Sequence, residues 1–571
     1  MKEKTLKVLK SNTLYALGLN AVFLIICIIF TSFSYGSHAD YLNSDLICHR
    51  HFYYSGTVNY LLANLIGTAQ YAFPSINCFV LFEVMASYAA FATITFVFAD
   101  KYQKRKAFVY TCALNILFAL SHYQSVDSAR TAALLCASGF LLVLLAIFKK
   151  RYSLSCWAGV LEVLFGSFLN ITYFFIALGF AVAFFLGDMI AKKKYRLQFQ
   201  KFFWYFRPFL LMFFFVSLVT MGLYQLSYSV NHATPEAKNY YEYAVLKNEV
   251  DSLPYPSFSD HADVFAKAGI NSESDYELLK NGYYDGDSTL NSDALKVVRK
   301  IQLKDNPKNF INTTATVFED IYKNAVTLQN SVLVIAAYLA LSLLFILFHK
   351  NRFSFFPLFY AIVGFISGFV LRFFFSGSEN LTYGIWIFMI AMLLNSFNFE
   401  EPRRPKPLSK LRNDRYLVIS CVTVVLLAAI NGIIYLYTQT EQKSGDAIRG
   451  ILSEIGRNPD NYYVMDPVTK IDFMEYTENY VHPMWGFRDE YLDNLDDFGY
   501  FHNDDKLRRR NLPENIYQAI LTNKKIYVID KTLVFKKEKY FSEHYTEIGG
   551  RAVYEQLSEP NGYGVYRVTV S

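Results

Sequence analysis

The chain has 571 residues, of which 53% are hydrophobic and 18% aromatic, whereas only 18% are charged. Soluble proteins carry about 25% charged residues, and apolar runs of about 20 residues recur here, each long enough to cross roughly 30 Å of hydrocarbon. A soluble protein is therefore excluded. The net charge of +6 is modest, and most Lys and Arg lie beside the apolar runs, so they indicate membrane topology and no nucleic-acid partner.

The apolar runs predict a polytopic α-helical membrane protein with about eleven transmembrane helices. The first run lacks a small-residue cleavage site and further runs follow it, so we interpret it as a span and not as a cleaved signal peptide. The predicted spans lie near residues 13–34, 75–99, 107–122, 130–148, 153–169, 172–190, 204–226, 329–349, 353–375, 382–398 and 416–437.

Basic residues gather at one set of span ends. They are Lys2, Lys4, Lys7, Lys10, Lys101, Lys104, Arg105, Lys106, Lys149, Lys150, Arg151, Lys192, Lys193, Lys194, Arg196, Lys350, Arg352 and the basic residues within 403–415. The opposite short loops carry little beyond Arg50 and Arg130. The positive-inside rule then predicts a protein of the cell membrane whose N-terminus is cytoplasmic and whose C-terminal domain lies outside.

Two long polar segments fall on the predicted outer side. The first, 227–328, belongs to a transmembrane module 1–437 that also includes an external loop at 35–74, and the second, 438–571, is predicted to be an extracytoplasmic α/β domain. Helices are expected near 234–249, 259–268, 273–281, 291–303, 443–457, 488–498 and 513–522, and strands at 462–466, 526–530 and 562–570.

The first two predicted strands end in Asp466 and Asp530. These aspartates could bind a ligand, because ligands of open α/β sheets bind at such strand ends. Alternatively, each could start a turn or cap a helix. Both interpretations stay open. The 438–571 domain has no cysteine, so no disulfide framework is expected. Walker loops, dinucleotide fingerprints and the HExxH and GxSxG motifs do not occur, which argues against nucleotide-dependent and zinc-protease chemistry.

The block SYGSHADYLNSDLICHRH, residues 34–51, follows the first span and is the best candidate for chemistry. Its titratable side chains include Asp40, Asp45, His38, His49 and His51. A carboxylate at a membrane interface can act as a general base toward an acceptor hydroxyl, or hold a divalent ion. The alternative is that these are solvated loop residues. The histidines lack a spacing that matches a metal site.

Two neighbouring segments support a site at this level. Residues 56–73 alternate apolar and amide side chains, as an interfacial helix would, and could form a wall for a lipid headgroup or merely cap the bundle. The turn at 121–130 carries His122, Gln124, Asp127 and Arg130. One interpretation is that Asp127 and Arg130 simply pair with each other at the surface, which contributes little stability. The other is that Arg130 binds phosphate while Asp127 orients the sugar or its base.

Three charged side chains within predicted spans need partners. Arg372 lies near the outer end of its span, where a phosphate would justify it and Glu379 could be its partner, although snorkelling to the surface is the alternative. Glu83 and Glu162 also lie in spans, and the sequence does not name their partners.

The acidic first loop, the interfacial helix, the bundle and the external C-terminal domain together resemble the GT-C superfamily of integral-membrane glycosyltransferases, which use polyprenyl-phosphate sugars. Within it the chain is similar to bacterial O-antigen glucosyltransferases and to related proteins that glycosylate wall polysaccharide or teichoic acid. Residues 240–279 also resemble the large external loop of uncharacterised polytopic proteins of Gram-positive bacteria. The resemblance covers the whole architecture, and its motifs are degenerate.

The family's acidic residue of the first external loop maps onto Asp40 or Asp45, and a second acidic position maps loosely onto Asp127. The adjacent acidic pair of some branches is absent, so the choice between Asp40 and Asp45 stays open. The resemblance implies that a hexose moves from polyprenyl phosphate to a surface polysaccharide or teichoic acid, with inversion and with the acid as base. Arg130 and Arg372 would offset the phosphate charge, and a divalent metal could take part but is not required.

Two rival functions are a polysaccharide polymerase and a lipid-linked oligosaccharide flippase or export protein. A polymerase would rarely carry a folded terminal domain, and a flippase would need charged groups through the middle of the bundle and little external mass. A structural membrane protein is a third class. The long polar segments favour the glycosyltransferase.

Overall fold

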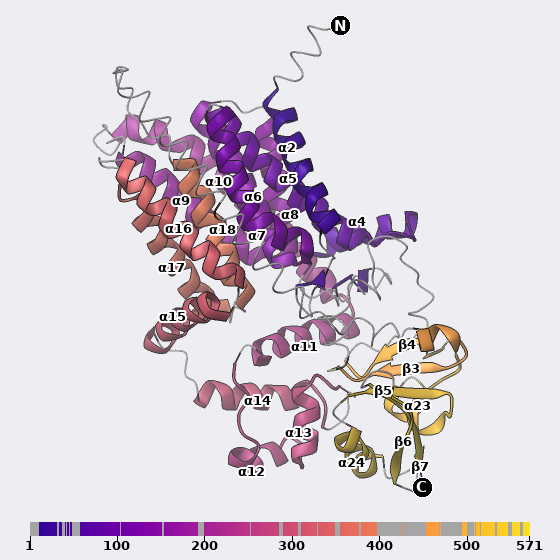
Figure 1. The fold of residues 1–571 in the computed structure, drawn as a ribbon. Helices are drawn as coiled ribbons and strands as arrows, with labels where there is room; N and C mark the ends of the chain where they lie inside the picture. Colours follow the sequence, from indigo (N-terminus) through magenta and orange to yellow (C-terminus); the bar gives the residue numbers. More distant parts are fainter. Residues whose placement is uncertain are drawn as a thin grey trace.

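The structure is a computed structural model (Figure 1). The residues that it describes are 11–30, 34–36, 40, 43–44, 46–47, 58–102, 104–150, 154–191, 199–251, 253–284, 289–305, 310–327, 329–348, 354–375, 379–396, 426, 451, 453–467, 469, 494–499, 507–508, 510–513, 515–531, 534–545, 551–559 and 563–570. The predicted span at 416–437 lies outside them except for Leu426.

Within the described residues, ten helices form the bundle, and each coincides with a predicted span. They are α2 (Asn12–Phe30), α5 (Cys78–Lys101), α6 (Lys104–Gln124), α7 (Ser128–Lys149), α8 (Leu154–Leu169), α9 (Ile171–Ala191), α10 (Phe199–Asn231), α16 (Gln329–Phe348), α17 (Phe356–Phe375) and α18 (Glu379–Ser396). In the described part of the chain, six helices are long and apolar enough to cross a membrane by length and composition. The polytopic helical fold is confirmed.

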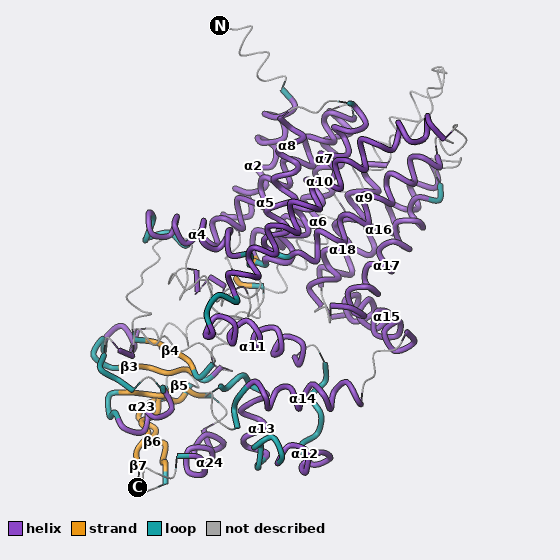
Figure 2. Tube along the Cα trace, turned by 180° about the vertical axis from the view of Figure 1, so that it is seen from behind, coloured by secondary structure: helices purple, strands orange, loops and turns teal. Residues whose placement is uncertain are grey.

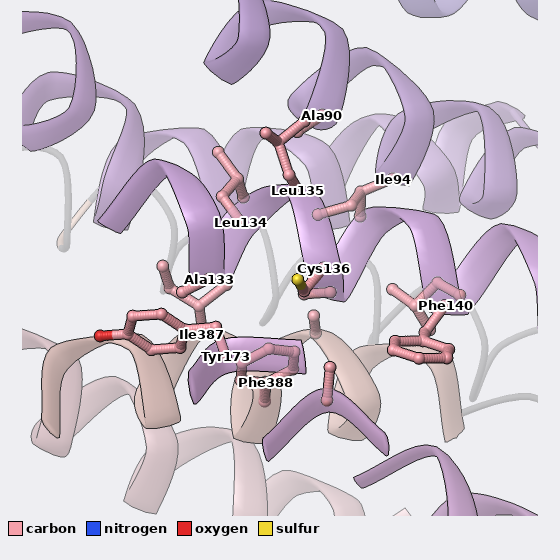
Figure 3. Packing of buried hydrophobic residues seen from close by; sticks show 14 of the residues in the cluster. Ala90, Ile94, Ala133, Leu134, Leu135, Cys136, Phe140, Tyr173, Ile387 and Phe388 are labelled. Atoms are coloured by element: carbon pink, nitrogen blue, oxygen red, sulfur yellow. The ribbon is translucent and has the colours of Figure 1, made fainter. Parts of the chain in front are cut away.

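Helix α7 lies at the centre of the bundle and packs against α5, α8, α9 and α18. Of its apolar stretch, 89% is buried inside the protein. Figure 3 shows Cys136 and Phe140 of α7 in a dense apolar layer with Ile94 of α5, Tyr173 of α9 and Phe388 of α18. Helix α7 is apolar on all sides, as expected of a helix with neighbours on all sides. Its packing therefore fixes the position of its first residues, Ser128 among them.

Glycines let α7 and α8 approach each other at the backbone. A Cβ atom at Gly159 would lie 2.8 Å from the carbonyl oxygen of Gly139, and one at Gly139 would lie 2.5 Å from the carbonyl oxygen of Gly159. Small residues at facing positions are the usual means of close helix packing in membranes. Any larger residue at this crossing would separate the two helices.

Three helices at the ends of the spans were predicted incompletely. The predicted interfacial segment contains a helix, α4 (Tyr60–Ala72), which lies across the end of the bundle (Figure 1). Helix α10 runs further than predicted and continues through Pro208. Helix α15 (Phe310–Thr327) was not predicted. It packs on α17, with 5.0 Å between the ring centroids of Phe310 and Phe369. The ring centroids of Phe318 and Phe365 are 5.2 Å apart.

Beyond the end of the bundle where α10 passes into α11 lies an extramembrane unit of helices and one sheet (Figure 1, Figure 2). Its helices are α11 (Pro235–Asp251), η3 (Ser259–His261), α12 (Ala262–Ala266), α13 (Glu273–Lys280), α14 (Ser292–Asp305), α23 (Ile516–Thr522) and α24 (Val534–His544). Its strands are β3 (Tyr462–Met465), β4 (Leu495–Asp497), β5 (Ile526–Asp530), β6 (Ala552–Ser558) and β7 (Gly564–Val570).

The sheet is mixed, with strand order β4-β3-β5-β7-β6. Strands β4, β3 and β5 are parallel, and β7 runs antiparallel to both β5 and β6. The three predicted strands are present, but the predicted helix 488–498 is wrong at 495–497, because these residues pair with β3 as strand β4. Strand β6 and helix α24 were not predicted.

One hydrophobic core joins the helices of the 227–328 segment to the sheet. Its buried members include Tyr243, Leu279 and Leu295 from α11, α13 and α14 together with Val464 and Val528 from the sheet. The division of the chain into 1–437 and 438–571 stays a prediction. The core takes residues from both sides of that boundary.

Candidate functional site

Two short strands bring the first loop to the turn between α6 and α7. Strand β1 (Ser34–Tyr35) pairs in parallel with β2 (Ser125–Val126), and the N–H of Gly36 donates to the carbonyl oxygen of Val126 at 2.8 Å. Backbone hydrogen bonds of this kind fix register. The residues that follow each strand, Asp40 and Asp127, are therefore led to the same place.

A side-chain network holds the rest of the described loop against the start of α5. The hydroxyl of Tyr35 donates to Oγ of Ser44 at 2.9 Å. Nδ2 of Asn77, the N-cap residue of α5, donates to Oγ of Ser44 at 3.0 Å and lies 3.2 Å from the Tyr35 hydroxyl. The neighbouring Leu46 and Ile47 are buried. The loop is thus fixed by hydrogen bonds and by apolar packing.

Ser128, the first residue of α7, connects two buried carboxylates. Its backbone N–H donates to Oδ1 of Asp40 at 3.0 Å, and its hydroxyl donates to Oε1 of Glu83 on α5, also at 3.0 Å. Asp40 is 3% exposed and Glu83 1%. The first N–H groups of a helix have no partner within the helix, and the helix dipole favours negative charge there. The N-terminus of α7 thus supplies a hydrogen bond to the Asp40 carboxylate.

Asp127 is the N-cap residue of α7. Its Oδ1 accepts from the backbone N–H of Arg130 at 3.0 Å, and its Oδ2 lies 3.3 Å from Nε of the Arg130 side chain. The predicted ion pair is present, but it is not on the surface, since the Asp127 side chain is 1% exposed and that of Arg130 17%. The role of Arg130 in binding phosphate stays a prediction.

His122 belongs to the same end of the bundle. Its Nδ1 lies 2.8 Å from the carbonyl oxygen of Phe118, one turn earlier in α6, and its Nε2 lies 3.3 Å from the carbonyl oxygen of Arg130. The ring also meets the Phe91 ring edge-on at 5.5 Å between centroids. These contacts hold His122 against the first turn of α7.

Of the other predicted site residues, the structure describes the side chain of Arg372 alone. Asp45, His38, His49 and His51 lie outside the described residues, and so do the side chains of Gln124, which ends α6, and Glu379, which begins α18. Arg372 lies in the last turn of α17, which packs against α9, α15 and α18. The substrate contacts of Gln124, Arg372 and Glu379 stay predictions.

Sequence reasoning missed Ser128 and did not place Glu83. A serine after an N-cap aspartate is a common start of a helix, so Ser128 carried no distinguishing signal. Glu83 did carry a signal, because an ionisable residue within a span requires a polar partner. Only the folded chain shows that the partner is Ser128.

The two aspartates at the strand ends of the extramembrane unit have protein partners. Asp466, after β3, accepts hydrogen bonds from the backbone N–H of Thr469 at 3.0 Å and from its hydroxyl. Asp530, at the end of β5, forms an ion pair with Lys537 of α24, and all these side chains are buried. Because residues 467 and 469 are helical, the contacts of Asp466 with Thr469, the third residue onward, are those of a helix-capping aspartate.

The charge of Asp466 is disfavoured where it lies. Burial raises the pKa of Asp466, and Lys537 opposes the rise by attraction. The carboxylate of Asp530 raises it further, and the hydrogen bonds from Thr469 lower it. Net, the pKa of Asp466 lies above its ordinary value.

Among the described residues, one group has the composition of a metal site. Asp275 on α13 and Glu543 and His544 on α24 hold ligand atoms within 4.8 Å of one another. The Asp275 carboxylate already accepts from the backbone N–H of Ser272 at 3.1 Å in a capping box and lies 3.3 Å from Nε2 of His544. These contacts account for the group as a link between α13 and α24.

Two crystal structures of ArnT from Cupriavidus metallidurans, a GT-C glycosyltransferase, are similar to the chain, one in the apo state and one bound to undecaprenyl phosphate. The sequence identities are 9% and 11%, the TM-scores 0.40 and 0.39, and each comparison covers 97% of both chains. No protein-family model matches the sequence, and no curated protein matches it significantly. Similarity at this level concerns the course of the chain and assigns no activity to it.

Proposed function

We propose that the chain is a membrane glycosyltransferase that moves a hexose from a polyprenyl-phosphate-linked donor to a surface polysaccharide or teichoic acid. The observation that carries the proposal is the buried Asp40 carboxylate, held by the N-terminus of α7 at the end of the bundle. A buried ionised group is costly unless it is hydrogen-bonded. The position of this carboxylate at the end of the bundle supports a role as the base toward a lipid-linked substrate.

The proposed reaction needs one base and one counter-charge. Asp40 takes the proton from the acceptor hydroxyl as its oxygen forms a bond to the anomeric carbon of the sugar. The bond from that carbon to the phosphate oxygen breaks, and its electron pair leaves with the polyprenyl phosphate. Attack opposite to the leaving group inverts the anomeric centre. Arg130 is the cation of the described cluster suited to offset the phosphate charge.

The donor class follows from chemistry and from the sequence resemblance. The sequence has no nucleotide-binding motif, so the activated sugar must come from another carrier. A polyprenyl tail can remain in the bilayer while its phosphate lies at the bundle end, beside Asp40 and Arg130. The acceptor would approach from the extramembrane unit, which lies beyond the same end of the bundle (Figure 2).

The test is Asp40→Asn in full-length protein reconstituted into nanodiscs. The probe is undecaprenyl phosphate carrying radiolabelled glucose or galactose, with teichoic acid or wall polysaccharide as acceptor, and the readout is label in the polymer. Loss of a general base lowers the rate about 10²- to 10⁴-fold. The matched control is Asp100→Asn at the opposite end of α5, where Asp100 pairs with Lys149. Wild-type transfer by folded Asp40→Asn protein would remove Asp40 from the base role.

A further inference from the structure

Helix α15 presents apolar side chains that the rest of the protein covers only in part. Ile311 is 77% exposed and Phe318 60%, and their spacing of seven residues places both on one side of the helix. Phe310, beside them, is also exposed. Asn312 and Thr316, which are exposed too, lie on a different side. A helix that exposes apolar side chains on one side and polar ones on another is typical of a membrane surface.

Helix α15 crosses α17 and does not run alongside it. Phe310 and Phe318 of α15 are eight residues apart, about 12 Å along a helix. Their ring partners on α17, Phe369 and Phe365, are four residues apart, about 6 Å along that helix. Helices with aligned axes would show equal spacings. Figure 1 and Figure 2 show α15 lying across the end of the bundle beside α16 and α17.

The exposed surface of α17 leads to α15. Leu358, Ile362, Ile366 and Val370 are exposed and follow one another at intervals of four residues, so they form one stripe along α17. Helix α17 is long and apolar enough to cross a membrane, where such a stripe meets acyl chains. Val370 follows Phe369, where α15 crosses. The exposed apolar side of α15 is therefore continuous with the lipid-facing surface of the bundle.

Helix α10 marks the boundary of the hydrocarbon. Trp204 and Tyr224 are both exposed and lie 20 residues apart, which corresponds to about 30 Å along the helix. A bilayer core has this thickness, and Trp and Tyr are enriched at its two boundaries. The exposed apolar side chains between them are Leu210, Leu211, Phe214, Phe215, Leu218 and Met221. One boundary therefore passes near Tyr224.

Helix α4 lies at this boundary. The backbone N–H of Tyr60, at its start, donates to Oγ of Ser227 on α10 at 2.9 Å, about one turn beyond Tyr224. Its exposed side chains include Leu65 and Tyr71. Helices α4 and α15 lie on opposite sides of the bundle at the same end, and both run across its helices (Figure 1, Figure 2). Helix α15 is therefore at the level of the same boundary.

We propose that α15 is an interfacial helix whose apolar side, with Ile311 and Phe318, is covered by acyl chains of the bilayer while its polar side faces water. The partner is the lipid surface itself, and the inference is independent of the sugar transfer proposed above. Helix α14 of the extramembrane unit ends at Asp305, shortly before α15 begins. The bilayer thus holds the extramembrane unit at this connection, in addition to the connection from α10 to α11.

Photocrosslinking identifies what covers the helix. p-Benzoylphenylalanine in place of Phe318 keeps an aromatic ring at this position, and the full-length protein is reconstituted into liposomes of phosphatidylethanolamine and phosphatidylglycerol. After irradiation, mass spectrometry and gel electrophoresis distinguish adducts with lipid, with another segment of the chain and with a second copy of the chain. We expect lipid adducts at position 318 in a yield close to that of the same probe in place of Phe214, on the exposed side of α10.

Val264 of α12 is the matched control, because it is also an exposed apolar residue but lies away from the bundle (Figure 1). The probe in place of Val264 should give no lipid adducts, and in place of Thr316 far fewer than at position 318. Equal yields of lipid adduct at 318 and 264 would overturn the proposal. Adducts at 318 with a second copy or with another segment of the chain, in place of lipid, would overturn it too.

A second position guards against a folding failure. The probe in place of Ile311 lies on the same side of α15 and should give the same lipid adducts, so the proposal stays testable if the variant at 318 does not fold. The readout is the identity of the adduct and involves no sugar transfer. A failure of the proposed function therefore leaves this result unchanged, and the reverse also holds.

Discussion

The Asp40 carboxylate accepts a hydrogen bond from the backbone N–H of Ser128, 88 residues further along the chain, at 3.0 Å. The bond joins the loop after α2 to the first turn of α7, a helix whose apolar stretch is 89% buried. A loop carboxylate thereby acquires the fixed position of a core helix. Its geometry depends on a main-chain group, so it can be tested only by a substitution that changes the backbone.

Ser128→Pro removes that donor and preserves the helix. Proline is well accepted as the first residue of a helix, and Asp127 before it already has the extended conformation that proline requires, with φ −144° and ψ 106°. A hydrogen bond to a charged group contributes about 1.5–3 kcal/mol, so sugar transfer should fall about 10- to 100-fold. Ser128→Ala keeps the N–H and should retain most activity. Equal activity of the two variants, with similar melting temperatures, would contradict this role of Ser128.

Gly159→Ala should disturb the helix that carries the site. The added methyl would lie 2.8 Å from the Gly139 carbonyl oxygen, and overpacking of this kind costs about 1–3 kcal/mol. We expect a lower melting temperature of the purified protein and reduced transfer, since α7 must move away from α8. Gly179→Ala on α9 is the control, because nothing lies within 4 Å of its added methyl. A loss of stability in the control as large as in Gly159→Ala would remove the packing argument.

Asp466→Asn should stabilise the extramembrane unit at neutral and alkaline pH. The pKa of Asp466 is raised in the fold, chiefly by burial. The stability contributed by its proton is therefore complete in acid, below the ordinary carboxyl pKa, and is lost as pH rises through the raised value. Asparagine carries no charge to bury and can still bond Thr469. Its melting temperature should exceed that of wild type by about 2 °C near pH 8 and match it near pH 4.

The exposed Asp460 provides the comparison for this pH dependence. Asp460→Asn removes one exposed carboxylate and controls for the change in net charge. The prediction fails if Asp466→Asn is less stable than wild type at pH 8, because that result would mean that the carboxylate is stabilised in its ionised form.

The membrane bundle could be predicted because its signal is local. Runs of apolar residues located ten helices, and the choice of Asp40 and of the Asp127–Arg130 pair came from charges next to those runs. Strand β4 could not be predicted, because Leu495–Asp497 takes its conformation from pairing with β3. Helix α15 was missed because its apolar side rests on α17, which places Phe318 against Phe365, and no local motif specifies such a contact.

The cluster itself could be predicted only in part. Asp40 and Asp127 are conspicuous in the sequence because they follow or precede spans. Ser128 is not, since its bond to Asp40 comes from a backbone donor that any residue but proline supplies. Glu83 comes to the cluster through the packing of α5 on α7, which depends on the whole bundle.

The interior shared by α11–α14 and the sheet has a practical consequence for isolating the extramembrane unit. A fragment that ends after α18 would leave Leu279 and Leu295 facing water, and a fragment that begins near residue 451 would do the same to Val464 and Val528. A water-soluble version would have to splice 235–305 to 451–570 and omit the spans between them. Such a minimal fragment would let glycan binding be measured without detergent and apart from Asp40.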